Sequence, residues 1–114
     1  MSGARRYIPK RGDLVWIDFD PAAGHEQKGK RPAVVISEQA FNRVTGLALA
    51  APVTSRVRGH GFEVAIEGTK KIGGVVLCQQ IKMVDFTARG MAFAEKAPAG
   101  VIAETLRKVR AIVA

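Results

Sequence analysis

Short apolar runs recur along the chain as far as residue 95, and glycine, proline or charged residues bound each of them. Runs rich in β-branched and aromatic residues between turn-forming residues predict β-strands. We expect strands over residues 13–19, 31–37, 47–53, 62–66, 75–84 and 91–95, the fifth of them interrupted by polar side chains. This pattern predicts a mainly β architecture with little helix before the C-terminal end.

Two segments follow helical patterns instead. Residues 38–43 hold better helix formers, Ser37 is suited to cap this short helix, and Gly46 is suited to end it. Residues 97–114 carry apolar side chains at spacings of four, three and four, which predicts an amphipathic helix. These side chains are Ile102, Leu106, Val109 and Val113. Because such a stripe usually packs on a core, we expect this helix to close one end of a β-barrel.

Chain length and composition indicate a single folded domain over residues 1–114. A chain of 114 residues has room for one modest core, and 47% hydrophobic residues argue against disorder. No apolar run approaches the ~20 residues needed to cross a bilayer, and no apolar segment follows the basic N-terminal residues as in a secretory signal. The lone Cys78 lies in an apolar run, where we expect a buried thiol. We therefore expect a cytoplasmic protein that neither spans nor binds a membrane.

The charge balance is strongly basic, with 18 Lys and Arg residues against 10 Asp and Glu residues and a net charge of +8. Such an excess fits a polyanionic partner, although basic charge by itself also keeps a protein soluble. Apart from a group on the C-terminal helix, the basic clusters fall in or beside turn-like segments, so loops would carry the positive field. These clusters contain Arg5, Arg6, Lys10, Arg11, Lys28, Lys30, Arg31, Arg56, Arg58, Lys70 and Lys71.

A glycine-containing segment between the first two predicted strands has more candidate catalytic side chains than any other part of the chain. It contains His25, Glu26, Gln27 and Arg31. Exposed loops between strands are common positions for catalytic groups, a guanidinium has forked donors that match phosphate geometry, and a histidine exchanges protons near neutral pH. Taken alone, a surface arginine at a strand end and a solvated loop histidine are the simpler interpretations.

Metal ions and nucleotide cofactors find little support in the sequence. His25 and His60 are the only histidines and Cys78 is the only cysteine, with no pair at the spacing of a zinc site. Asp18 and Asp20 would share one side of a strand, but two carboxylates make a weak magnesium site. The glycines match neither a P-loop nor a dinucleotide fingerprint. We expect no metal and no cofactor.

Several short motifs resemble the MazF/PemK family of toxin endoribonucleases, over residues 7–113 and in the family's order and spacing. The motifs are Gly12-Asp13, Asp20-Pro21, Gly24-His25-Glu26-Gln27, Gly29 with Arg31-Pro32-Ala33-Val34-Val35, Pro52-Val53-Thr54, and Gly74-Val75-Val76-Leu77 followed by Gln80-Ile81. The resemblance implies an SH3-like β-barrel with short helices and a C-terminal helix, and a homodimer. It further implies sequence-selective, metal-independent cleavage of single-stranded RNA and neutralisation by a cognate MazE-like antitoxin.

The resemblance also implies roles for particular residues. Arg31 and Thr54 occupy the positions of the family's catalytic arginine and hydroxyl residue. In the plasmid-borne branch of the family a histidine at the position of His25 joins the active site, together with an arginine and an aspartate on a later strand. At those two later positions this chain has Leu77 and Gln79. We therefore expect Arg31 and Thr54 to be the catalytic pair, with His25 as a helper.

Cleavage of RNA without a metal requires a base for the ribose 2′-hydroxyl, an acid for the departing 5′-oxygen, and donors for the phosphorane oxygens. The products are a 2′,3′-cyclic phosphate and a 5′-hydroxyl end. Arg31 suits the donor task, because a guanidinium with a pKa above ~12 stays charged. Glu26 is either the base or an ion-pair partner that orients Arg31.

The other candidates are residues that would bind RNA. Gln27 and Gln80 have paired donor and acceptor edges suited to reading splayed bases, and equally suited to satisfying a loop backbone. The rest carry positive charge: Lys28, Lys30, Arg56, Arg58 and Lys82. An acidic, flexible antitoxin tail would cover such basic loops. The alternative function is a non-catalytic basic SH3-like module that binds nucleic acid or a protein target such as gyrase.

Overall fold

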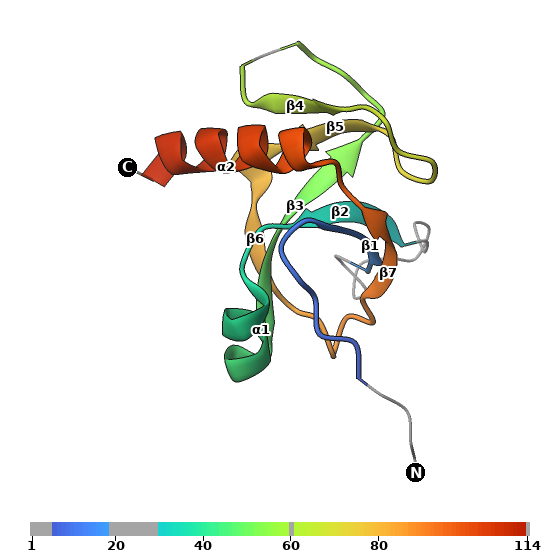
Figure 1. Ribbon diagram of the computed structural model, residues 1–114, viewed down its shortest axis with the longest axis vertical. Helices are drawn as coiled ribbons and strands as arrows, with labels where there is room; N and C mark the ends of the chain where they lie inside the picture. The colour runs from blue at the N-terminus through green and yellow to red at the C-terminus, as the bar shows by residue number, and fades with distance from the viewer. Residues whose placement is uncertain (1–5, 19–29, 60, 114) are drawn as a thin grey trace.

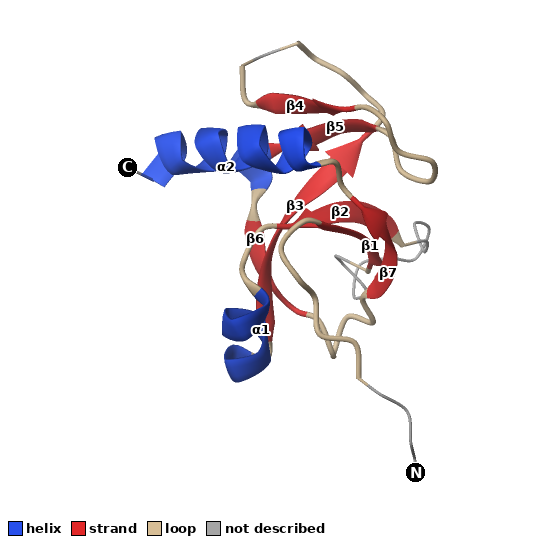
Figure 2. Cartoon of the chain, in the orientation of Figure 1, coloured by secondary structure: helices blue, strands red, loops and turns tan. Residues whose placement is uncertain are grey.

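The computed structural model describes residues 6–18, 30–59 and 61–113. Strands dominate the described part, and α1 and α2 lie at different ends of the strand region (Figure 2). The strands are β1 (Asp13–Ile17), β2 (Arg31–Val35), β3 (Leu47–Thr54), β4 (Glu63–Ile66), β5 (Gly74–Leu77), β6 (Lys82–Asp85) and β7 (Ala92–Lys96). The helices are α1 (Gln39–Thr45), the 3₁₀-helix η1 (Cys78–Gln80) and α2 (Ala99–Val113). None of the described helices is both long and apolar enough to cross a membrane.

The strands pair in the antiparallel order β4-β5-β3-β2-β1-β7, and β6 also pairs with β3. The long strand β3 organises this sheet. Its first half pairs with β6, its last two residues pair with β5, and its other edge pairs with β2. A strand shared among these neighbours curls the sheet into a half-barrel, which Figure 1 shows. The predicted mainly β, SH3-like barrel with a C-terminal helix is confirmed.

The central strands β1, β2 and β3 are buried on both faces, which explains why they are nearly continuous apolar runs. Leu14 of β1 and Val34 of β2 belong to one buried cluster, whereas their chain neighbours Val15 and Val35 belong to another. All four side chains are fully buried. Because successive side chains of a strand point to opposite faces, the same strands supply both clusters.

Helix α1 corrects one prediction, because its N-cap is Glu38 and not Ser37. The Ser37 hydroxyl instead donates to Asn42 Oδ1 at 2.5 Å and accepts the Leu49 N–H at 2.8 Å. A serine that joins the helix to β3 in this way is not available as a cap. Gly46 ends the helix as predicted, in the left-handed conformation with φ of 75°.

The prediction of one strand over residues 75–84 is wrong, because the chain forms β5 and β6 with η1 between them. Strand β5 pairs with the end of β3 and strand β6 pairs with its beginning. The chain must therefore change direction between them, and the exposed Gln79 and Gln80 mark that turn. Cys78, at the start of the turn, is fully buried as predicted, and this burial raises the pKa of its thiol.

Strand boundaries elsewhere differ slightly from the predicted ones. Strand β1 ends at Ile17, and residue 19 lies outside the described residues. Strand β2 ends at Val35 rather than at residue 37, while β3 continues through Thr54.

Helix α2 packs against β4 and η1 and covers that end of the sheet (Figure 1). The side chains that face the core are Val101, Ile102, Thr105, Leu106 and Val109. Val113 was expected in this stripe but is 72% exposed, because the helix continues past the strands it covers. The predicted amphipathic helix is confirmed, with its apolar face displaced towards the N-terminal turns.

Candidate active site

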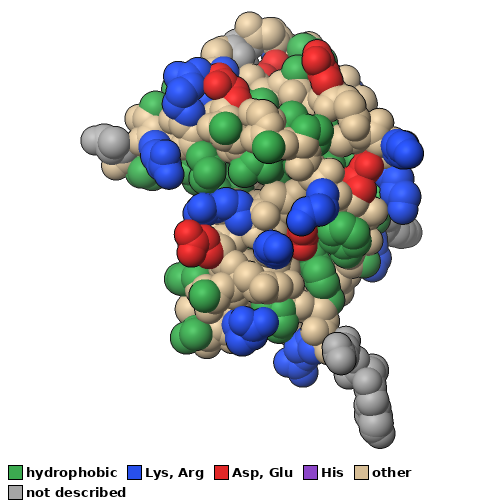
Figure 3. Space-filling model, in the orientation of Figure 1, with side chains coloured by type: hydrophobic (Ala, Val, Ile, Leu, Met, Phe, Trp, Pro, Cys, Tyr) green, Lys and Arg blue, Asp and Glu red, His purple; other side chains and the backbone are tan. Residues whose placement is uncertain are grey.

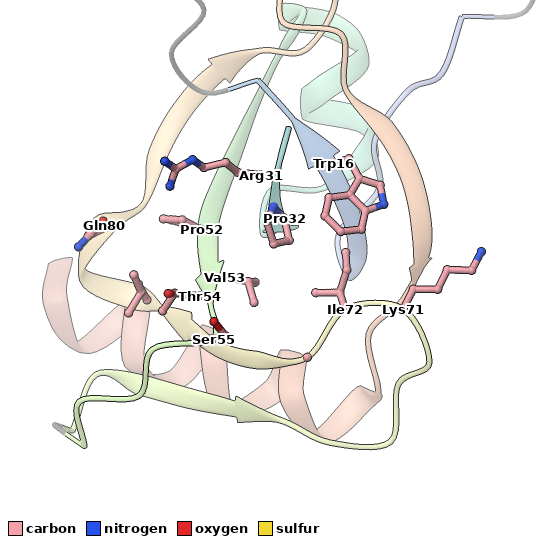
Figure 4. A pocket seen from close by; sticks show the side chains of 12 residues that line it. Trp16, Arg31, Pro32, Pro52, Val53, Thr54, Ser55, Lys71, Ile72 and Gln80 are labelled. Carbon is pink, nitrogen blue, oxygen red and sulfur yellow. The ribbon is translucent and has the colours of Figure 1, made fainter. Parts of the chain in front are cut away.

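A hollow of about 490 Å³, called here the main hollow, opens between β1, β2, the end of β3 and the connection from β4 to β5. Its lining consists of Trp16, Arg31, Pro32, Pro52, Val53, Thr54, Ser55, Lys71, Ile72, Gly73, Leu77 and Gln80. Figure 4 shows Arg31, Thr54 and Gln80 on one side of it and Trp16, Ile72 and Lys71 on the other. The tertiary fold thus brings Arg31 and Thr54 to one cavity.

Arg31 has a fixed base and an exposed side chain. It is the first residue of β2 and pairs with Ile17 of β1, and it is followed by Pro32, which has one fixed backbone dihedral. Among the described residues, no carboxylate forms an ion pair with the Arg31 guanidinium. A guanidinium held in this way presents its forked donors to the hollow and is suited to bind a phosphate group.

Thr54 is the last residue of β3, within the strand rather than after it. Its Oγ1 accepts the backbone N–H of Arg56 at 3.1 Å. Because the oxygen already accepts this bond, the hydroxyl hydrogen is directed elsewhere and can be donated to a ligand oxygen. The backbone of Thr54 is held by pairing with Val75 of β5.

A smaller cavity of about 270 Å³, called here the side hollow, adjoins the main hollow. Thr54, Leu77 and Gln80 line both. The other residues of the side hollow are Arg56, Arg58, Glu63 and Gln79. The apolar Leu77 therefore lies between the two hollows.

Glu63 holds the loop that carries the two arginines of the side hollow. Its carboxylate accepts the N–H of Arg58 at 3.1 and 3.0 Å and the N–H of Gly59 at 2.8 Å. Together with the bond from the Arg56 N–H to Thr54, these contacts fix both ends of a short exposed segment. Arg56 and Arg58 thus keep a defined backbone position next to Thr54.

The other predicted site residues either lie away from the two hollows or fall outside the described residues. Lys30 donates to the Gly90 carbonyl at 3.4 Å, and Lys82 lies on β6 opposite Ala50. Neither lines the two hollows. The four residues predicted in the loop before β2 lie outside the described residues: His25, Glu26, Gln27 and Lys28.

Several lining residues were not predicted as site residues. Trp16 was not among the expected site residues, and Lys71 was expected only as part of a basic cluster. Neither belongs to the short motifs of the sequence, so no motif indicated that they line the hollow. In the described part of the chain, no three side chains of His, Cys, Asp or Glu lie together.

Comparison with known proteins shows the family of the chain. Residues 10–113 match the profile described as "PemK-like, MazF-like toxin of type II toxin-antitoxin system". The chain is 47% identical over 85 residues to the endoribonuclease toxin MazF of Escherichia coli strain K12, a match that covers 75% of this chain and 76% of that protein.

Solved structures give the same result. The fold matches the crystal structure of MazF (Form-I) from Deinococcus radiodurans with a TM-score of 0.84. The two sequences are 44% identical, and the match covers 95% of this chain and 98% of that one. The fold also matches a MazE-MazF complex (Form-II) from the same organism, with a TM-score of 0.83 and 39% identity over 95% of this chain and 97% of the matched chain. The chain belongs to the PemK-like, MazF-like toxin family of type II toxin–antitoxin systems.

Proposed function

We propose that this protein is an endoribonuclease that cuts single-stranded RNA at the main hollow, without a metal ion and at a preferred sequence. The observation that carries the proposal is that a guanidinium from β2 and a hydroxyl from β3 line one open hollow. Such donors stabilise the negative charge that grows on phosphate oxygens during cleavage. The similarity to proteins named endoribonucleases supports the same activity.

In the proposed reaction the ribose 2′-oxygen bonds to the adjacent phosphorus and the bond from phosphorus to the 5′-oxygen breaks. The 2′-hydroxyl proton passes to a base and an acid supplies a proton to the 5′-oxygen, so the products are a 2′,3′-cyclic phosphate and a 5′-hydroxyl end. Arg31 and Thr54 donate hydrogen bonds to the phosphorane oxygens. His25 and Glu26 are our candidates for proton transfer, and Glu26 is also a candidate for orienting Arg31.

The side hollow would hold the nucleotide next to the cleaved bond. Arg56 and Arg58 supply charge for phosphate groups, and the exposed Gln80 supplies an amide that can pair with a base edge. We further propose that four residues outside the two hollows attract or read the RNA strand: Gln27, Lys28, Lys30 and Lys82.

Mapping the ends of RNA fragments tests the proposal. Purified protein incubated with single-stranded RNA and excess EDTA is expected to yield 2′,3′-cyclic phosphate and 5′-hydroxyl ends at a short recurring sequence. Arg31→Ala is expected to lower the cleavage rate by about 100-fold or more, since it removes a transition-state donor. Arg43→Ala, on the exposed surface of α1, is the matched control and should cleave like the wild type. Intact RNA with folded wild-type protein would contradict the proposal, and salt-dependent binding without product would favour the non-catalytic module.

We also propose that the protein is a cytoplasmic homodimer neutralised by an acidic MazE-like antitoxin. The match to a chain of a MazE-MazF complex supports the antitoxin. The net charge of +8 would attract an acidic flexible segment to the basic loops around the hollows. Co-expression with the product of the neighbouring small open reading frame tests this proposal. A product that neither binds nor relieves toxicity would count against it, and light scattering of the free protein measures the oligomeric state.

A further inference from the structure

One carboxylate ties the connection between β4 and β5 to strand β7. Glu95 Oε1 accepts the N–H of Lys70 at 3.0 Å, and Oε2 accepts the N–H groups of Lys71 at 2.6 Å and Ile72 at 2.8 Å. Lys71 Nζ also donates to the Ala94 carbonyl at 3.3 Å. Successive N–H groups that converge on one anion form an anion-binding nest, here filled by the protein's own side chain.

This connection forms the wall of the main hollow that faces Arg31 and Thr54. Figure 4 places Lys71 and Ile72 beside Trp16, across the hollow from Arg31. Ile72 is only 3% exposed and packs into the core, whereas Lys71 is exposed at the rim. The backbone that carries this rim lysine is therefore fixed by Ile72 from the inside and by Glu95 from the side.

We propose that Glu95 is a positioning residue that holds Lys71 where it contacts a phosphate of the bound RNA strand, beyond the phosphate that Arg31 binds. This inference rests on the proposed function. Glu95 acts through the loop backbone and does not touch RNA itself. The same N–H groups, first that of Lys70, hold the pKa of the Glu95 carboxyl below its usual range, so the carboxylate stays charged at neutral pH.

Removal of the Glu95 charge distinguishes positioning from simple electrostatics. In a protein of net charge +8, loss of a negative charge increases the long-range attraction to RNA. Positioning has the opposite consequence, because a released loop no longer holds Lys71 in place. Glu67 is the matched control, since it is exposed, is the first residue of the same connection and does not line the main hollow.

The experiment measures binding of a single-stranded 2′-O-methyl RNA, which cannot be cleaved by 2′-hydroxyl attack, at one fixed salt concentration. Glu95→Gln is expected to weaken binding by about tenfold, whereas Glu67→Gln leaves it unchanged or slightly tighter. In a Lys71→Ala background, Glu95→Gln is expected to add little, because its effect passes through Lys71. Equal or tighter binding by Glu95→Gln, or effects that simply add in the double variant, would overturn the inference.

Amide hydrogen exchange in the protein without RNA checks the clamp directly. Glu95→Gln is expected to accelerate exchange at residues 70–72, and Glu67→Gln is expected not to. Unchanged protection in Glu95→Gln also overturns the inference. A wild-type protein that does not bind the RNA overturns the proposed function itself, and this result differs from one in which only the variants behave unexpectedly.

Discussion

Thr54 owes its position in the main hollow to a close backbone approach at Gly74. Gly74 has a φ of +110°, and a Cβ built there would lie 2.2 Å from the Thr54 carbonyl oxygen and 2.9 Å from its carbon. Backbone atoms at such distances cannot be accommodated without a shift of β3 or β5. The absence of a side chain at position 74 is therefore a condition for the geometry of Thr54.

We expect Gly74→Ala to displace Thr54 and to lower RNA cleavage by about tenfold or more, because small displacements of positioning groups reduce rates strongly. The clash and the positive φ also predict a loss of stability. Gly100→Ala is the control, since an added Cβ there meets nothing within 4 Å and φ is not left-handed. Cleavage by folded Gly74→Ala at the wild-type rate would contradict this explanation.

Thr105 places a polar atom in the core without a described partner. The residue is 1% exposed, and its Oγ1 has no hydrogen-bond partner among the described residues. Burial of an unpaired hydroxyl costs about 1–3 kcal/mol, so Thr105→Val is expected to raise the free energy of unfolding by about 1 kcal/mol. Thermal unfolding measures this as an increase of a few degrees in Tm. Val101→Thr, one helical turn away, should have the opposite effect, and a lower Tm for Thr105→Val would refute the assignment.

At the scale of elements, the contact between β7 and the β4–β5 connection depends on pH. Hydrogen bonds from the loop backbone lower the pKa of Glu95 in the folded state. A lowered folded pKa means that the contact stabilises the fold above the unfolded pKa of about 4.3 and is lost as pH falls through the folded value. The amide resonances of residues 70–72 should therefore titrate in acid, below the ordinary glutamate range. In Glu95→Gln this titration should disappear, and its persistence there would assign it to another group.

For the molecule as a whole, the distribution of charge matters, and on the face seen in Figure 3 the lysines and arginines are scattered rather than gathered in one patch. In the proposed function, the net charge of +8 attracts RNA over a long range, whereas Arg56 and Arg58, which line the side hollow, contact bound phosphates. Salt dependence of binding separates these two contributions, because only direct contacts release counterions bound at those phosphates.

We expect Arg58→Ala to reduce the slope of log K against log salt concentration by about 0.7, the value for one phosphate contact on a single strand. Arg110→Ala removes the same charge from exposed helix α2, which does not line either hollow, and should leave the slope unchanged. Equal slopes for the two variants would mean that Arg58 acts only through net charge.

Prediction from the sequence succeeded where the signal was local. Apolar runs between turn formers indicated all the described strands, although the run over residues 75–84 split into β5 and β6. That split arises because two different stretches of β3 take one strand each, a long-range condition that no window of the sequence contains. The Ser37 cap failed for a similar reason, since its hydroxyl bonds to Asn42 and Leu49.

For the candidate site too, some features could be predicted from the sequence and others depend on the folded structure. The basic charge, the strand pattern and the motifs that contain Arg31, Thr54 and Gln80 can be read from the chain, because periodicity, composition and motif spacing are properties of the sequence. Three features follow only from folding: these residues share a hollow, Gly74 approaches Thr54, and Glu95 holds the loop of Lys71. Those contacts depend on strand register and sheet curvature, which arise when distant segments pack together.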